Sequence, residues 1–188
     1  VPALLLAIFV DPTHWSVVAF AVVFGVGAQD EFLRMALPVD EDDRAISLRT
    51  VGALFSTAIV LAPSVWDLGA LPPLLTFAAV ALGMTVLLRK EQLEHAGRHF
   101  SVALCAVMYV PLLMSVLPLL KRGGQPEWLT VTLCMAFFSD SVAYFFGRAF
   151  GKHKLYPAVS PGKTWEGSFG GILGSCLATV GVGSFWIL

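Results

Sequence analysis

The sequence predicts an all-α protein, a polytopic bundle of about seven membrane-spanning helices. Hydrophobic residues make up 57% of the 188 residues and charged residues only 13%, whereas soluble domains have about 25% charged residues. The mean hydropathy is +0.79, and apolar stretches near the roughly 20 residues that span a bilayer recur along the chain. This composition excludes a disordered chain, a secreted disulfide scaffold and an ordinary soluble enzyme.

Each predicted element is an apolar stretch bounded by Pro, Gly or charged residues. The stretches are 1–10, 15–33, 50–66, 71–88, 100–120, 128–146 and 169–188. Because Val1–Val10 is too short to cross a bilayer, we interpret it as part of a span whose beginning is missing rather than as a signal peptide. We therefore expect one integral membrane domain over residues 1–188, truncated at both ends.

The positive charges predict the orientation of this domain. Of the twelve Lys and Arg residues, all but Lys121 and Arg122 lie in loops on one side of the predicted membrane. Because Lys and Arg stay on the cytoplasmic side, we expect that side, with the polar loop at 147–168, to face the cytoplasm. The net charge of −1 and the short basic runs argue against nucleic acid as a partner.

Two acidic clusters leave alternatives open. Asp40 to Asp43 reads as a solvated loop, with a metal site as the alternative. Asp30 and Glu31 either end the second span or join a metal site.

Asp140 lies inside an apolar segment, where an ionisable side chain costs about 2.5–3.5 kcal/mol on insertion scales. Such a residue usually faces the bundle interior and marks a functional path. Helical spacing places Asp140, Tyr144 and Arg148 on one stripe that leads toward the cytoplasmic end of the segment. The alternative is a structural brace between Asp140 and one of the other two side chains.

The loop after this segment combines cations, hydroxyl groups and glycines, as a polyphosphate site requires. Ser160 before Pro161 predicts a helix N-cap with proline at the first helical position. Lys163 and Thr164 would then lie in the first turn, where the helix dipole favours anions. The alternative for Lys152 to Lys154 is contact with anionic lipid head groups.

Gly162-Lys163-Thr164 is not a P-loop, because that pattern requires glycine where Pro157 stands and a preceding strand. Small residues at 167, 170, 171, 174 and 175 have the spacing of closely packed membrane helices. A groove that admits a lipid tail is the alternative.

Three stretches, Ser139–Arg148, Phe150–Leu155 and Val159–Gly167, closely resemble the phosphatidate cytidylyltransferase (CDP-diacylglycerol synthase) family. The resemblance implies a multi-helix membrane enzyme that joins CTP to phosphatidic acid, releases pyrophosphate and uses Mg²⁺. The family's second signature, with its metal-binding carboxylates, has no match here. The chain is then either a fragment that lacks both ends or a catalytically incomplete protein. We favour an incomplete, inactive fragment whose other metal ligands lie beyond residue 188.

The resemblance also suggests roles for individual residues. Lys163, Arg148 and Lys152 would hold phosphates. Asp140 would bind metal or water, or orient Tyr144 and Arg148, and is with Lys163 and Arg148 a predicted catalytic residue. Hydroxyl donors would be Ser160 and Thr164, and Glu166 would orient Lys163. The predicted substrate-binding residues are Tyr144, Gly147, Gly151, Lys152, Ser160, Pro161, Gly162, Thr164, Glu166 and Gly167.

Two rival functions remain open at this point. One is a CTP-dependent kinase of a prenol or another lipid alcohol, which would use similar phosphate contacts. The other is an ion-coupled transporter with Asp140 as a relay, although a relay has no use for the lysine-bearing loop. For the favoured function we expect a bacterial inner membrane, surrounding membrane lipids as partners, and room for a homodimer.

Overall fold

The computed structural model describes residues 13–37, 42–88, 93–123 and 126–186 of the chain. Six of the described helices are long and apolar enough to cross a membrane. They match six of the seven predicted stretches, and the stretch 1–10 lies outside the described residues. The chain is therefore a helical, multi-pass membrane protein. It divides into two compact units, Val1–Gly124 and Gln125–Leu188, which we describe separately.

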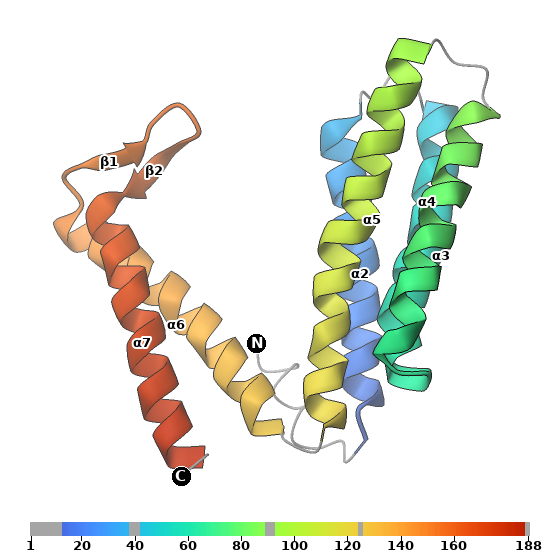
Figure 1. Cartoon of the computed structure of the whole chain (residues 1–188). Coiled ribbons are helices and arrows are strands. Elements are labelled where there is room, and N and C mark those ends of the chain that lie inside the picture. Colours follow the sequence, from blue (N-terminus) through green and yellow to red (C-terminus); the bar gives the residue numbers. More distant parts are fainter. Residues whose placement is uncertain (1–12, 38–41, 89–92, 124–125, 187–188) are drawn as a thin grey trace. The chain divides into compact units, whose positions relative to one another are not determined.

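The described residues of the first unit form four long helices and one short 3-10 turn. These are α2 (Trp15–Ala36), α3 (Asp42–Val65), η2 (Leu68–Ala70), α4 (Leu71–Leu87) and α5 (Leu93–Arg122) (Figure 1). Helix α2 ends where Leu37, which precedes Pro38 in the sequence, adopts an extended conformation, as a residue before proline prefers. Helix α4 begins with a Pro in its first turn, where the missing N–H costs nothing.

Close packing of α2, α3 and α5 builds the core of the first unit. Leu33, Leu82 and Val107 are at most 1% exposed and belong to one hydrophobic cluster. Gly52 lets α3 approach α2, because a Cβ atom there would lie 2.6 Å from Nε2 of the fully buried Gln29. The position is therefore restricted to glycine by its neighbour rather than by its own backbone angles.

An ion-pair cluster joins two helices of the first unit. Asp30 on α2 accepts hydrogen bonds from Arg34, at 2.9 Å, and from Nη2 of Arg49 on α3, at 3.0 Å. Helix α2 continues past Asp30 to Ala36. No group of three metal-ligating side chains occurs among the described residues. Asp30 is thus a brace between α2 and α3.

The second unit is an antiparallel helix pair with a small β-hairpin between the helices. Its elements are α6 (Pro126–Phe150), β1 (Lys154–Tyr156), β2 (Ser160–Thr164) and α7 (Trp165–Trp186) (Figure 1). Lys154 pairs with Thr164 and Tyr156 with Ser160 in the hairpin. The predicted loop over 147–168 is therefore too long, because α6 continues to Phe150 and α7 begins at Trp165.

Glycines make the contact between α6 and α7 possible. A Cβ atom at Gly170 would lie 2.5 Å from Cβ of Phe146, and one at Gly174 would lie 2.8 Å from the carbonyl oxygen of Phe138. These distances leave no room for a side chain. The predicted close helix packing is confirmed, and α6 covers the face that the alternative would have opened to a lipid tail.

Candidate functional site

Helix α6 supplies one wall of a pocket of about 700 Å³ within the second unit. Asp140, Tyr144 and Arg148 all line it, in keeping with their spacing of one helical turn. Nη1 of Arg148 donates a hydrogen bond of 3.1 Å to the hydroxyl of Tyr144. The phenol thereby fixes the guanidinium on the pocket side of the helix.

The hairpin and the start of α7 supply the opposite wall. Gly162, Lys163 and Thr164 of β2 line the pocket together with Gly167 and Ser168 of α7. The structure thus places Asp140 and Lys163, which are 23 positions apart in the sequence, around one shared cavity. An acid and two cations, Arg148 and Lys163, border the same space.

Thr164, and not Ser160, caps the helix that follows. Its hydroxyl accepts a hydrogen bond of 3.1 Å from the backbone N–H of Gly167, which is the N-cap to N3 contact. Ser160 and Pro161 lie on β2 instead, so the prediction of a helix start at Ser160 is wrong. Residues 160–164 pair with residues 154–156, so their backbone groups form strand hydrogen bonds and the helix begins only at Trp165.

Three glycines bring the two walls of the pocket together. A Cβ atom at Gly167 would lie 3.0 Å from the carbonyl oxygen of Ala143 and 3.2 Å from Cα of Gly147. At Gly151, just after α6, it would lie 2.8 Å from Cγ2 of Thr164, the residue that precedes α7. These contacts allow the start of α7 to meet the end of α6 backbone to backbone, which sets the width of the pocket.

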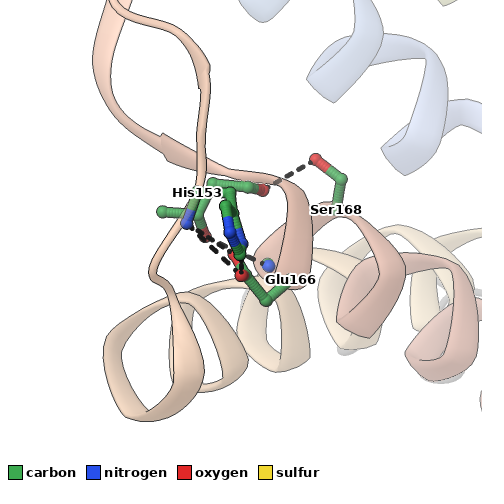
Figure 2. Close-up of polar contacts among 5 residues, drawn as sticks. His153, Glu166 and Ser168 are labelled. Carbon is green, nitrogen blue, oxygen red and sulfur yellow. Dashed lines mark hydrogen bonds and ion pairs between the residues drawn. The ribbon is translucent and has the colours of Figure 1, made fainter.

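Glu166 holds His153 rather than Lys163. The backbone N–H of His153 donates to both carboxylate oxygens at 3.3 Å, and Nδ1 of the ring lies 2.7 Å from Oε1 (Figure 2). The predicted contact between Glu166 and Lys163 does not occur. Sequence reasoning missed this role of His153 because the partners are 13 residues apart and only the hairpin brings them together.

The other predicted site residues lie outside the lining of the pocket. These are Gly151, Lys152, Ser160, Pro161 and Glu166. Lys152 is exposed.

Two lining residues were missed, namely Ala143 and Ser168. Helical spacing could have indicated both, since Ala143 precedes Gly147 and Ser168 follows Thr164 by one turn. Ser168 also donates a hydrogen bond of 3.1 Å to the carbonyl oxygen of Thr164 (Figure 2).

The donor set of the pocket limits how it can hold a metal. Asp140 is the only carboxylate among the described residues that line it. Protein sites usually bind Mg²⁺ through one or two carboxylates together with the phosphates of a substrate. One carboxylate beside two cations therefore fits a Mg²⁺ ion that arrives with a phosphorylated ligand, and does not form a cage for a metal alone.

The charges of the pocket suit a polyanion. In the part of the chain that the structure describes, neither Arg148 nor Lys163 forms an ion pair with a carboxylate. Both side chains are exposed, so their positive charges are accessible to an anionic ligand that enters the pocket.

Comparison with known proteins agrees with this chemistry. The model of the "Cytidylyltransferase family" matches residues 1–187. A phosphatidate cytidylyltransferase of Staphylococcus haemolyticus is 29% identical over 86% of this chain and 60% of its own length. The Haemophilus influenzae protein of that name is 56% identical over 24% of this chain and 16% of its own length. The Staphylococcus epidermidis protein of that name is 46% identical over 30% of this chain and 22% of its own length. The chain thus matches at most 60% of each of these relatives.

Proposed function

The chain belongs to the cytidylyltransferase family, and we propose that it forms the phosphate-binding part of an enzyme that makes CDP-diacylglycerol. The reaction transfers the cytidylyl group of CTP to phosphatidic acid and releases pyrophosphate. The observation that carries the proposal is the shared pocket, in which Asp140 and Arg148 of α6 face Lys163 of β2. The names of the relatives, phosphatidate cytidylyltransferases, support the choice of substrates.

The cations of the pocket bind and orient the two phosphorylated substrates. Lys163 and Arg148 neutralise the triphosphate of CTP, and Tyr144 holds the guanidinium of Arg148 in place. An oxygen of the phosphatidate forms a bond to the α-phosphorus of CTP while the bond to the β-phosphate breaks. That oxygen is already ionised near neutral pH, so no strong general base is required. Catalysis is then mainly positioning and charge neutralisation.

We assign Asp140 as the chain's own ligand for Mg²⁺. When bound, the ion would neutralise charge on the phosphates and help the pyrophosphate to leave. The carboxylate also partly offsets the positive charges of Arg148 and Lys163, which line the same pocket. Lys152 stays a proposed secondary phosphate contact, weaker than Lys163 because it lies outside the lining.

A product assay tests this function. The whole protein in detergent, given labelled CTP with phosphatidic acid and a prenol as competing acceptors, is expected to form CDP-lipid and pyrophosphate. Formation of CDP together with a phosphorylated prenol would instead indicate the lipid kinase.

Asp140→Asn should lower turnover strongly and shift its dependence on Mg²⁺. The control is Glu127→Gln in the first turn of the same helix. Equal turnover in wild type and Asp140→Asn would refute the role of Asp140.

We further propose that the hairpin faces the cytoplasm of a bacterial inner membrane. Ten of the twelve Lys and Arg residues lie near the connections α2–α3, α4–α5 and α6–α7. If each helix crosses the membrane in turn, these connections share one side with the hairpin, and the positive charges assign that side to the cytoplasm. A cysteine at position 152, in a variant without Cys105, Cys134 and Cys176, should react with an impermeant reagent only in inverted vesicles. Labelling of intact spheroplasts would show instead that the hairpin faces away from the cytoplasm.

A further inference from the structure

The base of the hairpin is fastened to α7 by a set of contacts that we call the clasp. It consists of His153, Trp165 and Glu166. The backbone N–H of Trp165 donates a hydrogen bond of 3.0 Å to the carbonyl oxygen of His153. The carboxylate of Glu166 accepts hydrogen bonds from the backbone N–H of His153, and its Oε1 lies within hydrogen-bond distance of the ring Nδ1 (Figure 2). His153, which immediately precedes β1, is thus held through its backbone N–H, its carbonyl oxygen and its ring Nδ1.

The clasp lies at the end of the hairpin that carries Lys163. The clasp directly follows the last pair of the hairpin, Lys154 with Thr164, and Lys163 is the next residue along β2. The hairpin has strands of only three and five residues, and an isolated pair of such strands is marginally stable. Contacts at its base therefore determine where β2, and with it Lys163, lies relative to α6.

Glu166 does not act on a ligand directly. It does not line the pocket, and its polar partner is His153. A carboxylate in the first turn of a helix also interacts favourably with the helix dipole. A purely structural role would therefore stabilise α7 without any specific link to the lysine.

We propose that Glu166 and His153 are positioning residues that hold Lys163 opposite Asp140 and Arg148. This inference rests on the proposed function of the pocket. The clasp fixes one wall, and helix α6 fixes the other. Loss of the carboxylate leaves the backbone contact of Trp165 to hold the base of the hairpin, so that Lys163 moves away from the phosphates while the α6 groups stay in place.

A double-mutant cycle in the whole protein separates positioning from general stabilisation. Glu166→Ala should lower kcat/KM about tenfold, mostly through kcat, since misplacement by about 1 Å can cost roughly a hundredfold. In a Lys163→Ala background the same change should have little further effect, because coupled residues are not additive. Glu166→Gln, which still accepts from the His153 N–H, should fall between. The matched control Glu127→Gln should retain wild-type activity.

Equal losses from Glu166→Ala in both backgrounds would overturn the proposal in favour of general stabilisation. A second measurement does not depend on activity. Hydrogen exchange of the amides at 153–164 should become faster in Glu166→Ala but not in Glu127→Gln. Unchanged exchange would refute the clasp itself. Faster exchange in a protein that forms no CDP-lipid would instead contradict the function proposed for the pocket and leave the clasp intact.

Discussion

The ion pairs of the first unit and the pocket of the second unit use their cations in opposite ways. In the first unit Arg34 and Arg49 both contact Asp30, and Arg122 lies 3.2 Å from the carboxylate of Asp67. In the second unit Arg148 contacts a phenol, and Lys163 forms no ion pair within the described part of the chain.

This difference separates structural charges from charges kept for a ligand. Neutralised groups can brace helices, whereas a cation that borders a pocket without a carboxylate partner is available to an anion. The comparison therefore predicts that substitutions in the first unit change stability, and that those in the pocket change activity. Four substitutions test this division, from the largest expected effect to the smallest.

Lys163→Ala should have the largest effect and should fall on activity alone. Removal of one group that stabilises transition-state charge costs about 10²–10³ in rate, and the exposed Lys163 supports no packing. Steady-state assays of the whole protein measure the loss, and thermal unfolding should be unchanged. Lys163→Arg keeps the charge and should retain more activity. Full activity in Lys163→Ala would break the comparison.

Gly170→Ala should destabilise the contact between α6 and α7. The added Cβ atom would lie 2.5 Å from Cβ of Phe146, and overpacking of this kind costs about 1–3 kcal/mol. Unfolding in detergent measures the change. Gly181, on the same helix, has no neighbouring atom within 4 Å. Gly181→Ala is therefore the matched control, and an equal loss there would point to the backbone rather than to packing.

Thr164→Ala should cost about 1 kcal/mol of stability through loss of the N-cap of α7. The hydroxyl that accepts from Gly167 disappears, while Thr164→Ser keeps it and should behave like wild type. Because Thr164 also lines the pocket, a fall in turnover in both variants would show that its methyl group matters to the site. Denaturation curves and assays on the same preparations check both effects.

Arg49→Met should have the smallest effect, a loss of at most about 1 kcal/mol of stability. Asp30 keeps its contact with Arg34 in this variant, so its charge is not left alone. Turnover should be unchanged. A larger fall in turnover than in stability would show that the ion-pair cluster of the first unit serves the reaction, and the division between the units would fail.

The sequence predicted the helices well because the bilayer acts on each one separately. Every stretch from 15–33 onward became a helix long and apolar enough to span, since length and hydropathy are local properties. The stripe of Asp140, Tyr144 and Arg148 followed from helical period alone, and the structure sets all three around one pocket.

The segment between α6 and α7 was harder to predict. The Ser-Pro pair at Ser160 has the form of a helix start, and it became part of a strand. The choice depended on pairing with residues 154–156, which no local preference of 160–164 reveals. Likewise Glu166 lies near Lys163 in the sequence but binds His153, because the turn of the hairpin carries the lysine toward the pocket.

By itself, then, the sequence determined that the chain spans a membrane, where its helices lie, and that an acid and a basic turn carry its chemistry. Only the tertiary structure decided that Asp140 and Lys163 share a cavity, that Thr164 caps α7, and that Glu166 fastens the hairpin. Hydropathy and helical period act over neighbouring residues, whereas a pocket requires backbones to approach, and at Gly147, Gly151 and Gly167 a Cβ atom would lie within 3.2 Å of a neighbouring atom.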